Sequence, residues 1–186
     1  MTRQLKEHDV QYTFQVAQQA SADVTDFLLT SFPRTVAVHN VEADPAYQEY
    51  DIDLLWTVQT REGSLRVVLV EVKGDRYHRT GNFFFETVSN EGKQTQGCFL
   101  YTKADFLFYY FVEIGRLYVL PMEQVRPWFA ANSHLFPERR TSTPAGISHY
   151  ITVGRLVPIH TATAENSGIL QYQRLAPGQW TRTEGQ

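Results

Sequence analysis

Apolar residues recur at three- and four-residue steps along the first part of the chain, from Val10 to Leu28. This spacing forms one apolar stripe on a helix, so an amphipathic helix is predicted there, ending before Pro33. The next segment, residues 34–41, is rich in Val and Thr and is predicted to form a strand.

Two apolar segments within residues 50–73 flank the polar turn Arg61-Glu62-Gly63, and they predict an antiparallel hairpin. A turn centred on Glu62 sets the register of the two strands. The second strand contains the run VVLVEV, whose β-branched residues are typical of a central, buried strand.

The pattern predicts three more elements in the middle of the chain. The run FFFETV, residues 83–88, is predicted to form a fourth strand, with Glu86 near its end. The motif TKAD resembles a helix start with Thr102 as N-cap, so a short helix is expected over residues 103–113. The segment GRLYVLP, with residues 116–120 at its centre, is predicted to be a strand.

The last third of the chain predicts a helix, MEQVRPWFAAN, with Pro121 at its first position and a potential kink at Pro127. From Thr141 onward a terminal hairpin is expected, followed by a polar tail with little periodicity. The order of helix, strand, hairpin, strand, helix, strand and helix predicts an α/β sandwich with a central mixed sheet flanked by helices.

Composition narrows the class of protein. The 186 residues, 42% hydrophobic and 20% charged, suit one globular domain spanning residues 1–186. A net charge of −3 means that nucleic-acid binding would need a local cluster of Lys and Arg. The single cysteine, Cys98, excludes an intramolecular disulfide and a multi-cysteine zinc site. No signal peptide or membrane span is predicted, so a cytoplasmic protein is expected.

The candidate chemistry lies in the 50–73 hairpin. With the turn at Glu62, Asp53 lies opposite Glu71 and Asp51 lies opposite Lys73, about 5 Å apart at Cβ. Charged groups in an apolar strand are costly unless they are paired or bind metal. Two facing carboxylates offer hard oxygen ligands, which favour Mg²⁺ or Mn²⁺. A metal beside an ammonium group is a plausible apparatus for hydrolysing a phosphodiester.

Asp53 and the sequence Glu71-Val72-Lys73 at the end of an apolar strand resemble the D…(D/E)xK signature of the restriction-endonuclease-like PD-(D/E)XK nucleases. The resemblance covers about residues 10–125 and implies an αβββαβ core, with residues 126–186 as a C-terminal extension. It implies an Mg-dependent DNA nuclease in which Asp53, Glu71 and the Val72 carbonyl bind the metal and Lys73 positions the attacking water.

Several assignments within this resemblance stay open. Asp51 is the alternative first ligand, because a bulge in the hairpin would exchange it with Asp53. Many resolvase-like members place a glutamate on the first helix, where this chain has glutamines, so Gln18 is the candidate there, and Glu86 is a second supporting candidate. Basic residues come after the site along the chain and are expected to contact DNA: Arg76, His78, Arg79, Lys93 and Lys103.

Three interpretations compete with a nuclease. The acids and Lys73 could form a structural ion-pair cluster. The missing helix-one glutamate motivates a catalytically inactive nuclease-fold protein that binds nucleic acid or serves as a scaffold. A metal-dependent hydrolase of nucleotides or small phosphate esters is a third alternative. A homodimer is a further expectation, by analogy with nucleases that cut both strands; the DNA structure recognised and the choice between endo and exo cleavage are left open.

Overall fold

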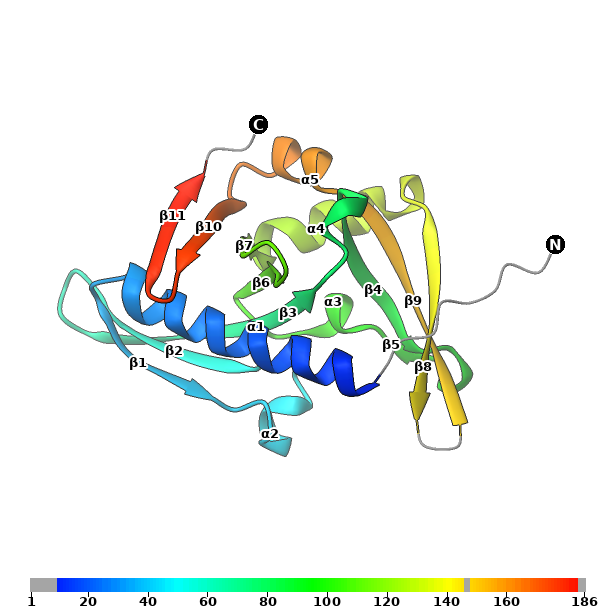
Figure 1. Ribbon diagram of the computed structural model, residues 1–186, viewed down its shortest axis with the longest axis horizontal. Helices are drawn as coiled ribbons and strands as arrows, with labels where there is room; N and C mark the ends of the chain where they lie inside the picture. The colour runs from blue at the N-terminus through cyan, green and yellow to red at the C-terminus, as the bar shows by residue number, and fades with distance from the viewer. Residues whose placement is uncertain (1–9, 146–147, 184–186) are drawn as a thin grey trace.

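The computed structural model describes residues 10–145 and 148–183, which form an α/β protein with two β-sheets (Figure 1). The larger sheet has seven strands: β1 (Thr35–Asn40), β2 (Leu54–Gln59), β3 (Leu65–Asp75), β6 (Phe106–Phe111), β7 (Arg116–Pro121), β10 (Leu170–Ala176) and β11 (Gln179–Thr183), in that order. The smaller sheet has four strands in the order β5 (Thr95–Gln96), β4 (Asn82–Asn90), β9 (Ser148–Pro158) and β8 (Glu138–Ala145).

The helices are α1 (Val10–Ser31), α2 (Pro45–Gln48), α3 (Cys98–Tyr101), α4 (Met122–Asn132) and α5 (Ile159–Glu165). Three short 3-10 helices are η1 (His78–Thr80), η2 (Glu91–Lys93) and η3 (Ser133–Leu135).

The larger sheet is mixed and curls around α1. Its neighbouring strands are antiparallel except for β3 and β6, which run parallel. Figure 1 shows β1 and β2 along one side of α1 and β10 and β11 along the other, and α1 contacts β1, β3, β6 and β11. The helix therefore lies in the hollow of a half-barrel.

The predicted first helix is confirmed, and its apolar stripe forms one of two cores. Ala20, Val24, Phe27 and Leu28 are fully buried against the sheet. Burying a side chain such as Phe27 or Leu28 stabilises the fold by about 1.5 to 3 kcal/mol. Gly74 of β3 makes close packing possible, because a Cβ there would lie 2.9 Å from the Val16 carbonyl oxygen.

The second core fills the space between the opposite face of the larger sheet, the four-stranded sheet and α4. It is rich in aromatic rings, among them Phe85 and Phe99, whose ring centroids are 3.9 Å apart, and Phe129, which packs edge-on against both. The two cores lie on opposite faces of β3, because its side chains alternate: Val68 and Val70 pack toward α1, whereas Glu71 points the other way.

The predicted register of the 50–73 hairpin is confirmed. Leu54 pairs with Val70 and Gln59 with Leu65, so the turn is centred on Glu62. One step beyond the paired residues the alignment shifts by one, because the Asp53 N–H donates at 2.9 Å to the carbonyl oxygen of Val70, which is already the partner of Leu54. The chain between β2 and β3 is therefore short enough for the turn alone to fix which side chains face each other.

The predicted helix over residues 103–113 is wrong, because most of this segment is β6. The run FLFYYF is buried on both faces of the sheet, and a continuous apolar run suits a doubly covered strand as well as a helix. Thr102 caps no helix over the residues after it; its hydroxyl donates to the Asp51 carbonyl oxygen at 2.8 Å.

Further differences concern the sheets and the C-terminal part. The predicted strand at residues 83–88 exists as β4 but belongs to the smaller sheet, so it does not extend the 50–73 hairpin. Pro121 precedes α4 as its N-cap residue, and Pro127 lies inside that helix. The predicted terminal hairpin is confirmed as β8 and β9, with residues 146–147 outside the described part. The tail predicted to lack periodicity instead forms α5 and the β10–β11 hairpin, which completes the larger sheet.

Candidate metal centre

A small pocket lies between the two sheets, on the face of β3 that is turned away from α1. Its polar lining includes Glu71 and Lys73 of β3, Glu86 of β4, and Cys98 at the start of α3. The pocket has a volume of about 10 Å³, which is the room that one water molecule or one ion needs. Segments far apart in the sequence therefore meet at a space that suits a single small occupant.

Asp53 lies beside Glu71, immediately before β2. Its Oδ2 accepts a hydrogen bond from the Val72 N–H at 2.8 Å, while its own N–H is bound to the Val70 carbonyl. In an extended strand the N–H and C=O of one residue point to the same side, so the Val72 carbonyl also faces the acids that precede β2. The backbone of β3 thus both holds Asp53 and offers an oxygen beside it.

Asp51 occupies a strained turn. Its φ of 56° is in the left-handed region, which Asp tolerates better than most residues. The turn is held by two hydrogen bonds from the segment after α3: the Thr102 hydroxyl donates to the Asp51 carbonyl at 2.8 Å and the Lys103 N–H to the Tyr50 carbonyl at 2.9 Å. These contacts fix the Asp51 side chain relative to α3, where Cys98 begins.

Three potential ligand atoms converge at this pocket. One carboxylate oxygen each of Asp51 and Glu71 and the Sγ of Cys98 all lie within 4.8 Å of one another. Within residues 10–145 and 148–183, Oδ2 of Asp51 and Oε2 of Glu71 are buried without a hydrogen-bond partner, and Glu71 is only 7% exposed. Buried carboxylate oxygens are normally paired, so two neighbouring acids that each have an unpartnered oxygen fit a bound cation. The donor set of two carboxylates meets the oxygen preference of Mg²⁺ or Mn²⁺.

Burial and mutual repulsion raise the pKa values of these acids. The Glu71 pKa lies well above its ordinary value, first because the side chain is buried and then because Asp53 and Asp51 are close. Burial also raises the Asp53 pKa to about 6, opposed by the hydrogen bond from Val72. Burial raises the Asp51 pKa in the same direction. A cation bound beside these acids would favour their ionised forms and so lower their pKa values again.

Lys73 provides the positive charge of the pocket. Burial alone would lower its pKa, but the acidic groups around it, Cys98, Glu86 and Glu71, together outweigh burial and raise the pKa above its ordinary value. The side chain is therefore an ammonium group at neutral pH. It can donate hydrogen bonds to a water or a phosphate oxygen in the pocket, and it cannot act as a base there.

Asp75 shares this face of β3 but is already satisfied. Its carboxylate accepts hydrogen bonds from the Tyr109 hydroxyl and, at 2.7 Å, from the Tyr77 N–H. The Tyr109 hydroxyl in turn accepts one from the Phe84 N–H of β4 at 3.0 Å. This chain of contacts joins the two sheets beside the pocket and distinguishes Asp75, a structural acid, from Glu71.

Of the other residues predicted from the sequence, one lines the pocket and most of the rest are exposed outside it. Glu86 lines it, and its pKa is raised by burial, whereas Gln18 is exposed on α1, which packs on the opposite face of the sheet. Lys103 is exposed and adjoins the Asp51 turn through its backbone. Arg79 in η1 and Lys93 in η2 are exposed as well.

Two residues predicted to contact DNA have protein partners. The Arg76 guanidinium lies 4.5 Å from the ring centroid of Tyr12 and 5.0 Å from that of Tyr77. The Nδ1 of His78 lies 3.6 Å from a carboxylate oxygen of Glu113.

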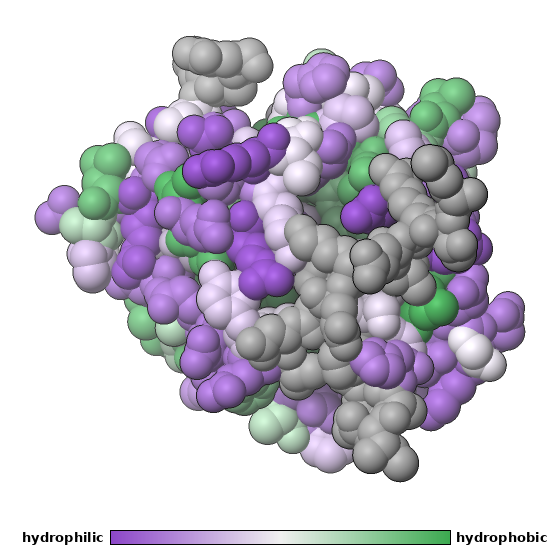
Figure 2. Space-filling view, turned by 45° about the vertical axis from the view of Figure 1, so that its right-hand side comes forward, coloured by the Kyte–Doolittle hydropathy of each residue, from purple (hydrophilic) through white to green (hydrophobic). Residues whose placement is uncertain are grey.

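The surface on the side of the four-stranded sheet is mostly hydrophilic, with hydrophobic residues in separate small groups (Figure 2). Among the helices of residues 10–145 and 148–183, none has the length and apolar character to cross a bilayer.

Cys98 is the site residue that sequence reasoning missed, because it is distant in sequence from the acids and has no motif around it. The one available signal is the preceding Gly97. A Cβ on Gly97 would lie 2.5 Å from the Glu86 carbonyl, so only glycine allows this segment to lie against β4. The Gly97 N–H also donates to the Thr87 carbonyl at 2.9 Å, which brings Cys98 beside Glu86.

The chain was compared with models of protein families, with curated proteins and with solved structures, and none of these comparisons gives a match. A function for this chain therefore has to be argued from the geometry and the charge of the pocket.

Proposed function

We propose that this protein is a metal-dependent nuclease that hydrolyses phosphodiester bonds in DNA. The observation that carries the proposal is the pair of unpartnered buried oxygens, Oδ2 of Asp51 and Oε2 of Glu71. Asp51 lies close to Glu71, and Glu71 lines the same pocket as the Lys73 ammonium. A structural ion-pair cluster would leave no oxygen without a partner. Here the acids outnumber the single ammonium, so the pocket lacks positive charge.

Each residue has a defined role in this proposal. Asp51, Glu71 and the Val72 carbonyl hold a Mg²⁺ or Mn²⁺ ion, and Asp53 either joins them through its second oxygen or orients the Val72 backbone through the hydrogen bond at 2.8 Å. When bound, such an ion lowers the pKa of a coordinated water and stabilises charge on the phosphate oxygens. Lys73 donates hydrogen bonds that orient the attacking water toward phosphorus.

The topology supports the restriction-endonuclease-like part of the proposal. An αβββαβ order in one mixed sheet requires a helix, three antiparallel strands and a last strand that returns parallel to the third. In this chain α1, β1, β2 and β3 are followed by β6, which pairs parallel with β3. The connection departs from that order, since it consists of β4, β5 and the four-residue α3 where the core order has one helix.

Exposed basic residues near the pocket support DNA as the substrate class. The Lys103 N–H donates to the Tyr50 carbonyl oxygen in the Asp51 turn, and Arg79 lies in η1 beyond the end of β3. Their exposed side chains can contact phosphates on either side of the scissile one. His78 lies beside Glu113 and Arg76 lies on tyrosine rings, so in this proposal they do not make the main phosphate contacts.

A second candidate function is a nuclease-fold protein that binds nucleic acid, or serves as a scaffold, without cutting. Two observations favour it: the pocket has a volume of only about 10 Å³, and the first helix brings the exposed Gln18 in place of an acid. With the sheets in this arrangement the Lys73 side chain is only partly exposed. Turnover would then require β4 or α3 to move away from β3.

The test is cleavage of supercoiled, linear and single-stranded DNA by the purified protein in Mg²⁺ or Mn²⁺. The nuclease proposal predicts cleavage that EDTA abolishes and that Glu71→Gln and Lys73→Met each remove. Glu62→Gln, the same chemical change at the exposed hairpin turn, is the matched control and should cut normally. DNA binding without cutting would select the second candidate, and hydrolysis of nucleotides alone would point to a small-molecule phosphoesterase.

A further inference from the structure

Cys98 is the one potential soft ligand in a pocket of hard ones. It is the first residue of α3, and the contact of Gly97 with β4 sets its position. Its Sγ lies within 4.8 Å of a carboxylate oxygen of both Asp51 and Glu71. A thiol carries a single weak donor hydrogen, so it can satisfy at most one oxygen of the two acids.

The charges that face Cys98 come from every element around the pocket. Asp51 precedes β2, Glu71 and Lys73 are on β3, and Glu86 is on β4. Three carboxyl groups thus accompany one ammonium group. Glu71, only 7% exposed and with Oε2 unpartnered, is the buried polar side chain that points to a cation as ligand.

Resting on the proposed function, we infer that the Cys98 Sγ is a third protein ligand of the metal, beside the oxygens of Asp51 and Glu71. As the metal–sulfur bond forms, the thiol proton is released to solvent, and the thiolate stays bound to the ion. Soft thiolate ligands favour transition-metal ions over Mg²⁺. The site is therefore selective for divalent ions such as Co²⁺ or Zn²⁺ over Mg²⁺.

This ligand set differs in kind from an all-oxygen site. Mg²⁺ retains its waters and gains little from sulfur, so it would use only the two carboxylates and the Val72 carbonyl. A transition-metal ion would use the sulfur as well. Removing Cys98 should therefore affect the two kinds of ion unequally, which separates metal ligation from a structural role of the side chain.

The experiment is a titration of the full chain, without a histidine tag, with Co²⁺ as the probe. Because Cys98 is the only cysteine in the chain, any thiolate-to-cobalt charge-transfer absorption in the near ultraviolet reports on this residue alone. We expect the band to saturate at one ion per chain. Cys98→Ser should abolish the band and weaken Co²⁺ and Zn²⁺ binding at least about 10-fold, with Mg²⁺ binding changed less than about 3-fold. Glu71→Gln should weaken binding of all three ions.

The outcomes separate this inference from the nuclease proposal. A wild-type protein that binds Co²⁺ without the band, or a Cys98→Ser variant with unchanged Co²⁺ affinity, overturns the inference even where metal-dependent cleavage persists. A band that disappears in Cys98→Ser supports it even if no DNA substrate is cut, in which case only the nuclease proposal fails. Circular dichroism of Cys98→Ser in the absence of metal controls for loss of folding.

Discussion

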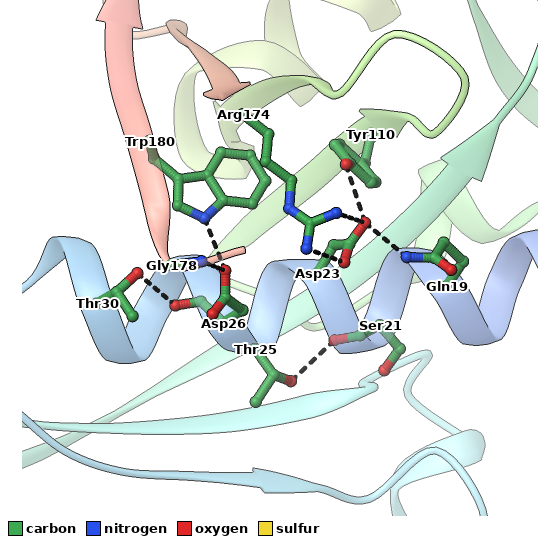
Figure 3. A network of polar contacts seen from close by, with 10 residues as sticks. All are labelled: Gln19, Ser21, Asp23, Thr25, Asp26, Thr30, Tyr110, Arg174, Gly178 and Trp180. Atoms are coloured by element: carbon green, nitrogen blue, oxygen red, sulfur yellow. Dashed lines mark hydrogen bonds and ion pairs between the residues drawn. The ribbon is translucent and has the colours of Figure 1, made fainter. Parts of the chain in front are cut away.

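Two buried carboxylates on opposite faces of the larger sheet differ in how many of their oxygens have hydrogen-bond partners. Asp23 of α1 is 4% exposed, and its oxygens accept hydrogen bonds from Arg174 at 3.0 and 3.1 Å, from the Tyr110 hydroxyl at 3.0 Å and from the Gln19 amide at 2.8 Å (Figure 3). Glu71 of β3 is 7% exposed and has one oxygen without a hydrogen-bond partner in the described part of the chain.

The difference between these two acids separates a buried acid that holds parts of the fold together from a buried acid that is available to bind a ligand. The Asp23 network ties β10 to α1, and nearby the Asp26 carboxylate accepts from the Trp180 indole at 3.0 Å and the Gly178 N–H at 2.9 Å, so the last hairpin is held to the first helix (Figure 3). The Oε2 of Glu71 has no comparable donor among the described residues. A fully paired acid stabilises the fold, whereas an unpaired one destabilises it until a ligand arrives.

The largest expected effect is on catalysis by the unpaired acid. Glu71→Gln should reduce metal-dependent cleavage by at least about 10³-fold, equivalent to about 4 kcal/mol, because a neutral amide does not hold the cation. The same variant should unfold at an equal or higher denaturant concentration than wild type without metal, since it removes a buried repulsion. Denaturant unfolding in EDTA measures this, and a clear loss of stability would mean that Glu71 is a structural acid after all.

The paired acid should behave in the opposite way. Asp23→Asn should lower the free energy of unfolding by about 3 to 5 kcal/mol, because it leaves the Arg174 guanidinium partly buried without its counter-charge. At temperatures where the variant is folded, its metal affinity should match that of wild type. Urea unfolding and a metal titration test both statements, and unaltered stability would remove the contrast with Glu71.

The pH dependence of stability should report on the unpaired acids. The Asp53 pKa is raised to about 6 from 3.8, so its stabilising contribution is fully present below pH 3.8 and is lost as the pH rises through 6. At 1.36 kcal/mol per pKa unit this amounts to about 3 kcal/mol at most, less what solvent screening removes. Urea unfolding of the metal-free protein at a series of pH values from below 3.8 to above 6 should show the decline. Asp53→Asn should make the free energy of unfolding fall less with pH. Saturating Mn²⁺ should offset the fall, because it binds the folded state at higher pH. A free energy of unfolding that rises over this pH interval would contradict the account.

The smallest effect on the free energy of unfolding should come from removing one of the hydrogen bonds to Asp23. Tyr110→Phe removes only the hydroxyl that donates to Asp23, whose other donors remain. The free energy of unfolding should fall by about 1 to 2 kcal/mol. DNA cleavage should not change, because Tyr110 faces α1 and not the pocket; a cleavage defect would show that the two faces of the sheet are coupled.

The hairpin that carries Glu71 can be predicted in detail because its turn is local. The position of Gly63 and the apolar runs on either side fix the register of β2 and β3 without reference to the rest of the chain. The prediction for the segment 106–111 is wrong for the converse reason. Its apolar run is the same whether it is a buried helix or a strand covered on both faces, and only pairing with β3 and β7 decides.

The candidate site is predictable only where its residues are neighbours on the hairpin. The hairpin pattern singles out Asp51, Asp53, Glu71 and Lys73, but its register sets Asp53 against Glu71, whereas the structure groups Asp51, in a turn with positive φ, with Glu71. Cys98 reaches the same group through the second sheet, whose packing no local pattern reveals. The β10–β11 hairpin escapes prediction because its strands are only half-buried, so their alternation of polar and apolar residues is weak.

The most direct test of the central claim is anomalous diffraction from a crystal soaked in Mn²⁺ at a pH above 7. We predict one strong anomalous peak between the carboxylates of Asp51 and Glu71, at a coordination distance of about 2.1 Å from each. Strong peaks found only elsewhere, with Glu71 hydrogen-bonded to a protein donor, would contradict the claim.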